Sequence, residues 1–289
     1  MSIKVLSRLG SRTSIYLSST VILLLFLLLL LISILHLKSL FSVIMDWTWT
    51  SCLFLFFFTH RLAASPAVAD HCREGAIKSP EVFGVKITSV SAAPVTNFSA
   101  SFPQIDPHPV LNIEGLSFCN VSIHYTHPGQ NDTIKVEVWL PSQWNGRFMG
   151  TGGGGYTTGF APDNTVYPAS LGYATAFTDG GHAASGLSPS SWALSSPGNV
   201  DWIALQDFAA IALDDAASIG KAVTKSYYGK PPEFTYFNGC STGGRQGLML
   251  AQRYPTQYNG ILASAPAINW DRLLPGAYWP QLMLDTIGS

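Results

Sequence analysis

The chain has 289 residues, with 16 lysines and arginines against 17 aspartates and glutamates, and a formal net charge of −1. Residues 70–289 contain 11 of the basic and 16 of the acidic residues and no basic run, which argues against nucleic acid as a partner. These 220 residues are enough to bury the core of one domain.

Residues 1–69 are predicted to be an apolar targeting segment. The run VILLLFLLLLLISIL at Val21–Leu35 follows basic residues, a pattern typical of a signal-peptide core or of a signal anchor at residues 21–37. A second apolar run precedes Ala67-Val68-Ala69, a small-x-small cleavage pattern. Because signal peptides have about 15–30 residues, cleavage after Ala69 fits translation from Met45. The alternative is a membrane anchor retained at residues 21–37, the one membrane contact that the sequence suggests.

Cysteines and glycosylation sequons also favour a secreted protein. Sequons of the form N-x-S/T occur at Asn97, Asn120 and Asn131. Secretion favours disulfides, so Cys72 and Cys119 are predicted to pair, since Cys52 lies in the targeting segment. Cys240 is then left with no partner in the chain.

The strand-like and helix-like segments of residues 70–289 alternate in the second half. Strand-like segments are predicted, in order, at Phe83–Val90, Val121–His127, Ile134–Leu140, Arg147–Gly150 and Ala174–Thr178. An amphipathic helix is predicted at Gln206–Ser226, then a strand at Phe234–Phe237, a helix at Thr242–Tyr254 and a strand at Gly260–Ala265. Residues 269–289 show no clear period. This alternation predicts an α/β fold with parallel strands and right-handed crossovers.

Ser241 is the candidate nucleophile. Gly239-Cys240-Ser241-Thr242-Gly243 has the form G-x-S-x-G between a predicted strand and a predicted helix, the context in which a strained turn exposes a serine hydroxyl. The N–H of Thr242, at the helix N-terminus, is a candidate oxyanion donor. The alternative is a glycine-rich turn with no chemical role.

The glycine run after the strand at Arg147–Gly150 is the candidate source of a second oxyanion donor. Gly153 or Gly154 is predicted to supply that N–H, because glycine lets the backbone approach a substrate closely. Asp179 and His182 precede the serine and are interpreted as residues that structure a loop, with a place in the lining of the site as the alternative. No histidine pair occupies ligand positions on a helix, so no metal site is predicted, and His127 is interpreted as a strand-end residue.

Three motifs carry a resemblance to a known family. They are FCNVSIHYTHPGQNDTIKVEVWLPSQWNGRFMGTGGGGY, GYATAFTDGGH and FNGCSTGGRQGLMLAQRYPTQYNGILASAPAINW. From about Cys72 to its last residue the chain resembles the tannase/feruloyl esterase family of secreted carboxylic ester hydrolases. The resemblance implies an α/β-hydrolase core, an inserted lid that binds calcium and the aromatic acyl group, and a serine triad. Ser241 matches the nucleophile, and Cys240 matches a cysteine that is disulfide-bonded to a cysteine beside the histidine.

The expected function is that of a serine esterase acting on phenolic esters, such as those of plant cell walls. The resemblance implies that the triad Asp, the His–Cys pair and the calcium-binding lid would lie beyond Ser289. Residues 70–289 are therefore expected to be the N-terminal part of an α/β-hydrolase domain, inactive without the base. The alternative is a secreted or membrane-anchored protein that keeps a degenerate hydrolase fold and binds without turnover. Within enzymes, a peptidase or lipase on the same fold is the second choice.

Overall fold

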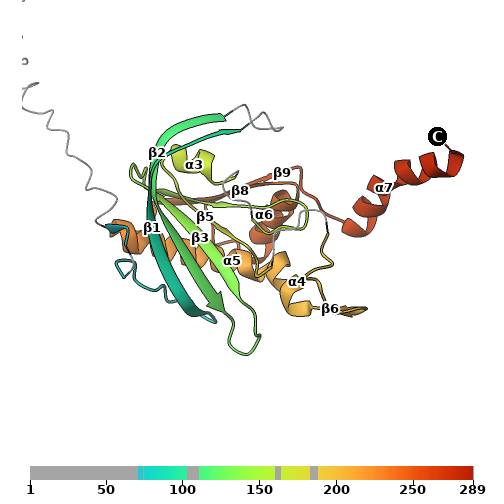
Figure 1. Ribbon diagram of the computed structural model, residues 1–289, viewed down its shortest axis with the longest axis horizontal. Coiled ribbons are helices and arrows are strands. Elements are labelled where there is room, and N and C mark those ends of the chain that lie inside the picture. Colours follow the sequence, from blue (N-terminus) through green and yellow to red (C-terminus); the bar gives the residue numbers. More distant parts are fainter. Residues whose placement is uncertain (1–70, 74, 103–110, 160–163, 183–187, 289) are drawn as a thin grey trace, which may run out of the picture. The chain divides into compact units, whose positions relative to one another are not determined.

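The computed structural model describes residues 71–73, 75–102, 111–159, 164–182 and 188–288, so the predicted targeting segment lies outside the described residues. One seven-stranded sheet dominates the fold, with the strand order β1-β2-β3-β5-β4-β8-β9 (Figure 1). The strands of this sheet are β1 (Lys86–Phe102), β2 (Leu111–Thr126), β3 (Ile134–Pro141), β4 (Arg147–Thr151), β5 (Ala174–Thr178), β8 (Phe234–Cys240) and β9 (Gly260–Ser264). A separate hairpin consists of β6 (Leu194–Ser196) and β7 (Asn199–Val200).

The sheet is antiparallel at one side and parallel at the other. Strands β1, β2, β3 and β5 pair antiparallel, whereas β5, β4, β8 and β9 pair parallel. The parallel strands confirm the predicted α/β class. Because the carboxyl ends of parallel strands meet at one edge, the loops after β4, β5, β8 and β9 gather there, where open α/β sheets bind their ligands.

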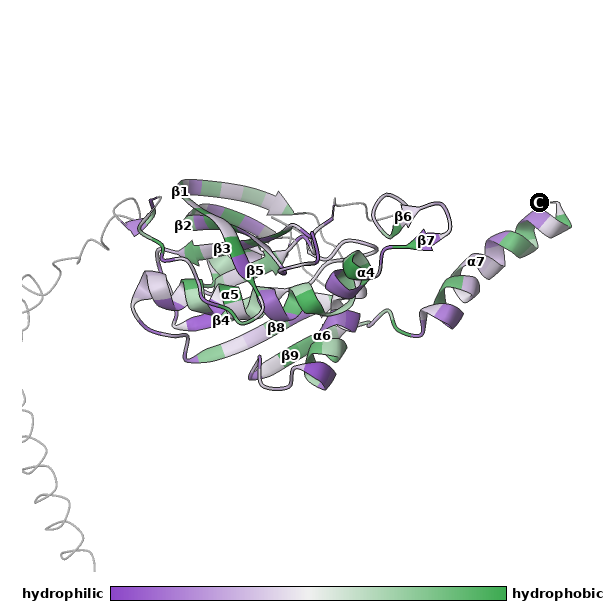
Figure 2. Ribbon diagram, turned by 90° about the horizontal axis from the view of Figure 1, so that it is seen from below, coloured by the Kyte–Doolittle hydropathy of each residue, from purple (hydrophilic) through white to green (hydrophobic). Residues whose placement is uncertain are grey.

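Residue alternation along β3 explains how both faces of the sheet are covered. Val136, Val138 and Leu140 are fully buried in the larger apolar cluster, which includes residues of α5 (Ile211–Tyr228) and α6 (Thr242–Arg253). Trp139 belongs to a second cluster with Val166 and Ala169 of α3 (Val166–Ser170). Neighbouring residues of a strand point to opposite faces, so α5 and α6 cover one face and α3 the other. Figure 2 shows apolar residues in β3, α5 and α6.

The predicted helix at Gln206–Ser226 is two helices, α4 (Trp202–Ala209) and α5, and the single-helix prediction was wrong at Ala210. Ala210 has φ −155° and ψ −51°, which interrupts the helical path. The break leaves carbonyls at the end of α4 without helical partners, and the Arg245 guanidinium donates to those of Ala209 (3.0 Å) and Phe208 (3.3 Å). An amphipathic pattern that runs through both helices does not reveal such a break.

The last helix, α7 (Trp270–Ile287), lies where the sequence shows no clear period. It contains Pro275 and Pro280 and has no buried residue, and its large apolar side chains, such as Trp279 and Ile287, are exposed (Figure 1). In the described part of the chain, no helix is both long and apolar enough to span a membrane.

The structure contains the predicted disulfide between Cys72 and Cys119, which joins residues 47 positions apart.

The three sequon asparagines differ in their surroundings. Asn97 and Asn131 are exposed and have positive φ, a conformation that asparagine tolerates. Asn120 is half-buried, and its amide nitrogen donates to Glu137.

Candidate active site

Ser241 occupies a sharp turn between β8 and α6. Its backbone has φ 60° and ψ −116°, the conformation of the first central residue of a type II′ turn, which favours glycine. A non-glycine residue in this region stores about 1–3 kcal/mol of strain, and such residues cluster at functional sites. The Ser241 side chain is exposed, whereas the next residues, Thr242 and Gly243, are buried. The turn therefore presents one hydroxyl to solvent, as the motif predicted.

The glycine at the start of the motif is required by packing. A Cβ on Gly239 would lie 2.5 Å from the backbone of Gly243, so no larger residue fits without moving the helix start. Gly244 is equally confined, since a Cβ there would lie 2.2 Å from the Ser264 carbonyl oxygen. The sharp turn can close only because these positions lack side chains.

Backbone hydrogen bonds from the neighbouring strand hold the turn in place. The Ser241 N–H donates to the Ser264 carbonyl at the end of β9 (3.1 Å). The Ala267 N–H donates to the Ser241 carbonyl (2.9 Å). These bonds fix the strained residue from both sides.

The glycine loop after β4 is hydrogen-bonded directly to the start of α6. The Gly243 N–H donates to the Gly153 carbonyl (3.0 Å), and the Thr242 hydroxyl donates to the Gly155 carbonyl (2.6 Å). A Cβ on Gly153 would lie 2.2 Å from the Thr157 carbonyl oxygen, so the loop is folded tightly on itself. The structure thus brings the two predicted halves of an oxyanion site, residues 153–154 and Thr242, next to each other.

The N–H groups of these residues are not equally available. The Gly153 N–H donates to the side-chain oxygen of Gln246 (3.1 Å). The Gly154 N–H has a long contact of 3.4 Å with the Thr157 hydroxyl, which is a weak bond. The Thr242 N–H belongs to the first turn of α6, where N–H groups have no partner within the helix. The N–H groups of Gly154 and Thr242 are therefore the more available of the predicted donors.

Gln246 is a structural determinant of the site that the sequence analysis missed. Its side chain is fully buried, and its amide nitrogen donates to the Thr158 carbonyl (2.9 Å) while its oxygen accepts from Gly153. One side chain of α6 thereby satisfies backbone groups at two points of the glycine loop. The signal was a glutamine one helical turn before the buried Leu250, on the inward face of the helix.

Arg245 connects α6 to α4. Besides its bonds to α4 carbonyls, its guanidinium lies over the rings of Phe208 (4.9 Å) and Trp270 (5.9 Å). Burial lowers the pKa of Arg245 to about 10, so it stays protonated at neutral pH. Arg245 therefore links the start of α6 to the end of α4 and lies beside aromatic rings.

Asp179 and His182 lie in the loop after β5 and make structural contacts. Asp179 accepts from the N–H groups of Lys135 (2.9 Å) and Gly181 (2.8 Å). The His182 ring is buried, stacks on Trp192 with centroids 4.0 Å apart, and its Nε2 is hydrogen-bonded to the Thr158 hydroxyl (3.0 Å). These contacts fit the loop-structuring role predicted for both residues.

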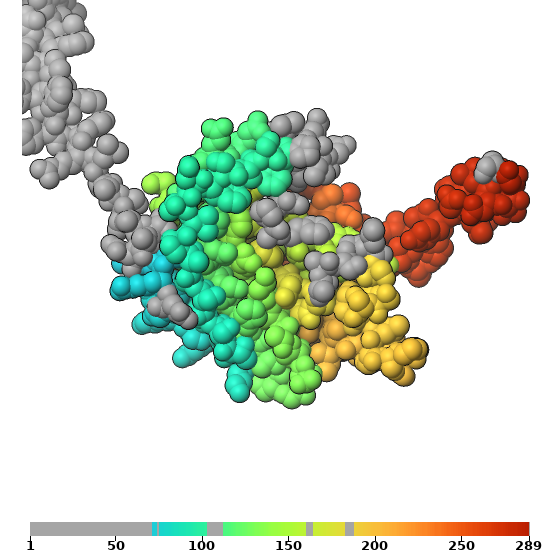
Figure 3. Space-filling model, viewed as in Figure 1, coloured from blue at the N-terminus to red at the C-terminus, as the bar shows by residue number. Residues whose placement is uncertain are grey.

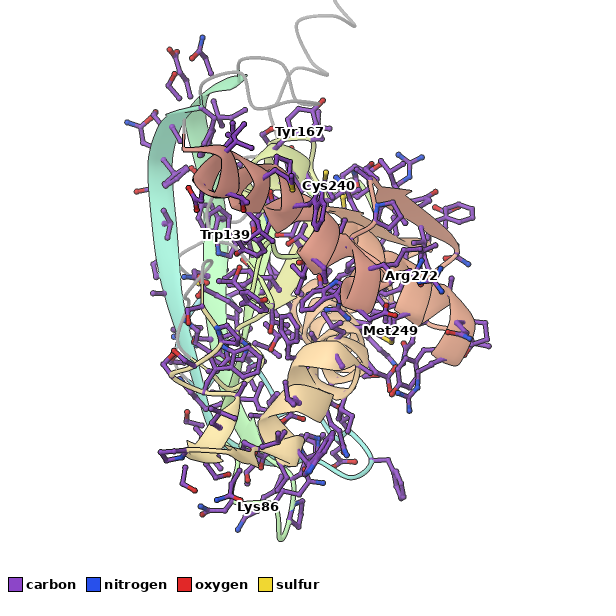
Figure 4. The ribbon with its side chains drawn as sticks, turned by 90° about the vertical axis from the view of Figure 1, so that its right-hand side faces the viewer. Lys86, Trp139, Tyr167, Cys240, Met249 and Arg272 are labelled. Carbon is purple, nitrogen blue, oxygen red and sulfur yellow. A yellow bond between two sulfur atoms is a disulfide. The ribbon has the colours of Figure 1, made fainter. Side chains whose placement is uncertain are left out.

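Cys240 is half-buried at the end of β8, next to the candidate nucleophile. Figure 4 marks it where the strand turns into α6, with Met249 further along the same helix. It is a free cysteine within the part of the chain that the structure describes.

Comparisons with known proteins identify the family. The profile of the "Tannase and feruloyl esterase" family matches residues 119–282, which include the glycine loop and the Ser241 turn. A probable feruloyl esterase of Arthroderma benhamiae is 43% identical over 227 residues, covering 78% of this chain and 42% of the relative.

Solved structures of a tannin acyl hydrolase and a feruloyl esterase share the fold of this chain. Tannin acyl hydrolase from Aspergillus niger matches with a TM-score of 0.64 at 28% identity, covering 76% of this chain and 40% of that structure. Feruloyl esterase B from Aspergillus oryzae matches with a TM-score of 0.52 at 32% identity, covering 66% and 36%. The chain spans less than half the length of these relatives. The profile covers more than half of this chain, and the chain belongs to the tannase and feruloyl esterase family.

Proposed function

We propose that the protein is a serine carboxylic ester hydrolase that forms an acyl-enzyme at Ser241. The observation that carries the proposal is the exposed hydroxyl on a strained residue at the strand-to-helix turn. A purely structural turn would gain stability from glycine at this position, whereas a nucleophile needs the side chain and the exposure.

In the proposed reaction, the Ser241 oxygen attacks the ester carbonyl carbon while a general base takes the hydroxyl proton. The N–H groups of Thr242 and Gly154 stabilise the tetrahedral oxyanion, and Gly153 supports the loop through Gln246. The alcohol then leaves with a proton, and water releases the acid from the serine ester. The described histidines with hydrogen bonds, His124, His127 and His182, are engaged elsewhere. We therefore propose a base outside the described residues, in the position that the family resemblance implies.

The proposed substrates are esters of phenolic acids, of the feruloyl or galloyl type. This proposal rests on the names of the matched relatives, which are feruloyl esterases, a tannase and a tannin acyl hydrolase. The calcium-binding lid implied by the resemblance remains a prediction, as does the absence of a cofactor in the chemical step.

The test compares the full-length protein with its Ser241→Ala variant on methyl ferulate and methyl gallate. We expect the variant to lose at least ~10³-fold in kcat while keeping wild-type folding. Retained turnover would place the nucleophile elsewhere. A wild-type protein that binds these esters and hydrolyses none of them would favour the non-catalytic alternative.

We further propose that the protein is secreted, with cleavage after Ala69. The Cys72–Cys119 disulfide supports this, because disulfides persist in oxidising compartments. Sequencing the N-terminus of protein from culture medium tests it, and a chain beginning at Asp70 is expected. A chain retained in the membrane fraction that still contains residues 21–37 would contradict it.

A further inference from the structure

Acidic side chains surround His127 where the turn between β2 and β3 meets α4 and α5. Metal-ligating atoms of His127, Asp132 and Asp207 all lie within 4.8 Å of one another. The His127 and Asp132 side chains are 11% and 5% exposed, and Asp207 is 1% exposed. Figure 3 shows the turn and α4 as neighbouring surfaces, green and yellow. The sequence analysis considered histidine pairs on a helix, and this cluster instead joins segments 75 positions apart.

Asp207 is the member of the cluster with the least hydrogen bonding among the described residues. Its Oδ1 is buried and has no hydrogen bond among the described residues. The charged groups that act on its carboxyl are Asp132, His127, Asp215 and Asp201, of which only His127 can carry a positive charge. Burial and the nearby Asp132 raise the pKa of the Asp207 carboxyl to about 7, because both disfavour its ionised form. A bound cation would stabilise that ionised form.

Asp132 is held so that one oxygen faces His127. Its Oδ1 accepts from the Thr126 hydroxyl (2.7 Å) and from the His127 backbone N–H (2.8 Å). Its Oδ2 is in close contact with His127 Nδ1. The carboxylate is thus fixed before any ligand arrives.

The opposite nitrogen of His127 is held by another carboxylate. His127 Nε2 lies 3.0 Å from Asp215 Oδ2, which also accepts from the buried Tyr125 hydroxyl (3.0 Å). A histidine that binds a metal through one nitrogen commonly donates its other N–H to a carboxylate, which fixes the ring and raises its basicity. Asp215 therefore holds the ring with Nδ1 toward Asp132.

We propose that His127, Asp132 and Asp207 bind one divalent transition-metal cation, for which Zn²⁺ is the probe. The ligand atoms would be His127 Nδ1, Asp132 Oδ2 and Asp207 Oδ1, and binding would release to solvent the Nδ1 proton and the proton of any protonated Asp207. One imidazole and two carboxylates suit Zn²⁺ or Mn²⁺, whereas Ca²⁺ takes six to eight oxygen ligands. In a tetrahedral site, ligand atoms about 2.0–2.2 Å from Zn²⁺ lie about 3.3–3.6 Å apart. Binding would therefore open the close contact between His127 and Asp132 and draw Asp207 toward them.

The position of the site gives it a structural role. Asp207 is followed in α4 by Phe208 and Ala209, whose carbonyls accept hydrogen bonds from Arg245 of α6. A cation at Asp207 would tie the β2–β3 turn to α4 and, through Arg245, to the helix that begins after Ser241.

The experiment is a calorimetric titration of the EDTA-treated full-length protein with Zn²⁺, comparing wild type with Asp207→Asn and Asp214→Asn. Asp214 is the matched control, because it is a partly buried α5 aspartate bonded to Gln257 outside the cluster. We expect Asp207→Asn to bind one equivalent fewer than wild type, or at least tenfold more weakly at one site, with Asp214→Asn unchanged. Equal binding by wild type and a folded Asp207→Asn would overturn the site.

A second measurement keeps the test decisive if Asp207→Asn does not fold. Crystals of the wild-type protein soaked in Zn²⁺ are measured at the zinc absorption edge. An anomalous peak within bonding distance of His127, Asp132 and Asp207 supports the site. Its absence at full soaking overturns the proposal.

Discussion

Replacing Gln246 by methionine removes the side-chain link between α6 and the glycine loop while keeping a similar volume. The change leaves two buried backbone groups, the Gly153 N–H and the Thr158 carbonyl, without their partners. Each unsatisfied buried group costs about 1–3 kcal/mol, so the free energy of unfolding should fall by about 2–6 kcal/mol. This is a large share of the ~5–15 kcal/mol that stabilises a typical domain.

The same change should slow the chemical step. Gly153 precedes the proposed donor Gly154, and a displacement of about 1 Å in such a loop lowers a rate by about 10²-fold. We therefore expect kcat on methyl ferulate to fall about 10²-fold in full-length Gln246→Met, with a smaller change in KM. Urea unfolding gives the stability of the same sample.

Gln252→Met is the matched control, because Gln252 lies on the same helix with an exposed side chain. It should change neither stability nor kcat by more than a small factor. If Gln246→Met retained wild-type kcat and unfolded at the wild-type urea concentration, the loop would not depend on Gln246 and the oxyanion argument would fail.

Two further predictions concern strain and glycosylation. The free energy of unfolding of Ser241→Gly should exceed that of Ser241→Ala by about 1 kcal/mol, because only glycine adopts φ 60° without strain. Ser241→Gly should therefore have the higher urea midpoint, and equal midpoints would show that the turn is relaxed. Glycopeptide mass spectrometry of secreted protein should find glycans at Asn97 and Asn131, which are exposed, and none at Asn120, whose amide nitrogen donates to Glu137. A glycan at Asn120 would mean that this bond forms only in unmodified chains.

The sequence predicted much of the fold because local patterns coincide with the strands. Ala174–Thr178 and the start of β3 at Ile134 were located from apolar residues alone. Strand β1 extends to Phe102, well past the predicted Val90, because its burial along an edge is only partial and its apolar pattern is weak. The break at Ala210 could not be predicted, because the amphipathic pattern continues through it. The helix at Trp270–Ile287 could not be predicted, because its sequence shows no clear helical period.

The site was partly predictable for a similar reason. G-x-S-x-G is a contiguous motif, and its first glycine is needed for a local steric reason. A Cβ on Gly239 would lie 2.5 Å from the backbone of Gly243. The choice between Gly153 and Gly154 depends on Gln246, which lies 93 positions from Gly153. The cluster at His127 likewise requires Asp207 to meet a turn far away in the sequence. Contacts of this kind are set by tertiary packing, which no local pattern encodes.

The central claim is that Ser241 becomes acylated, and trapping that ester tests it most directly. The full-length protein is mixed with a feruloyl ester, quenched in acid within the first turnovers, digested and analysed by peptide mass spectrometry. The account predicts a feruloyl group on the peptide that contains Ser241, and no such adduct in Ser241→Ala. Steady hydrolysis with the acyl group on another residue, or with no adduct on any serine under rapid quench, would contradict it.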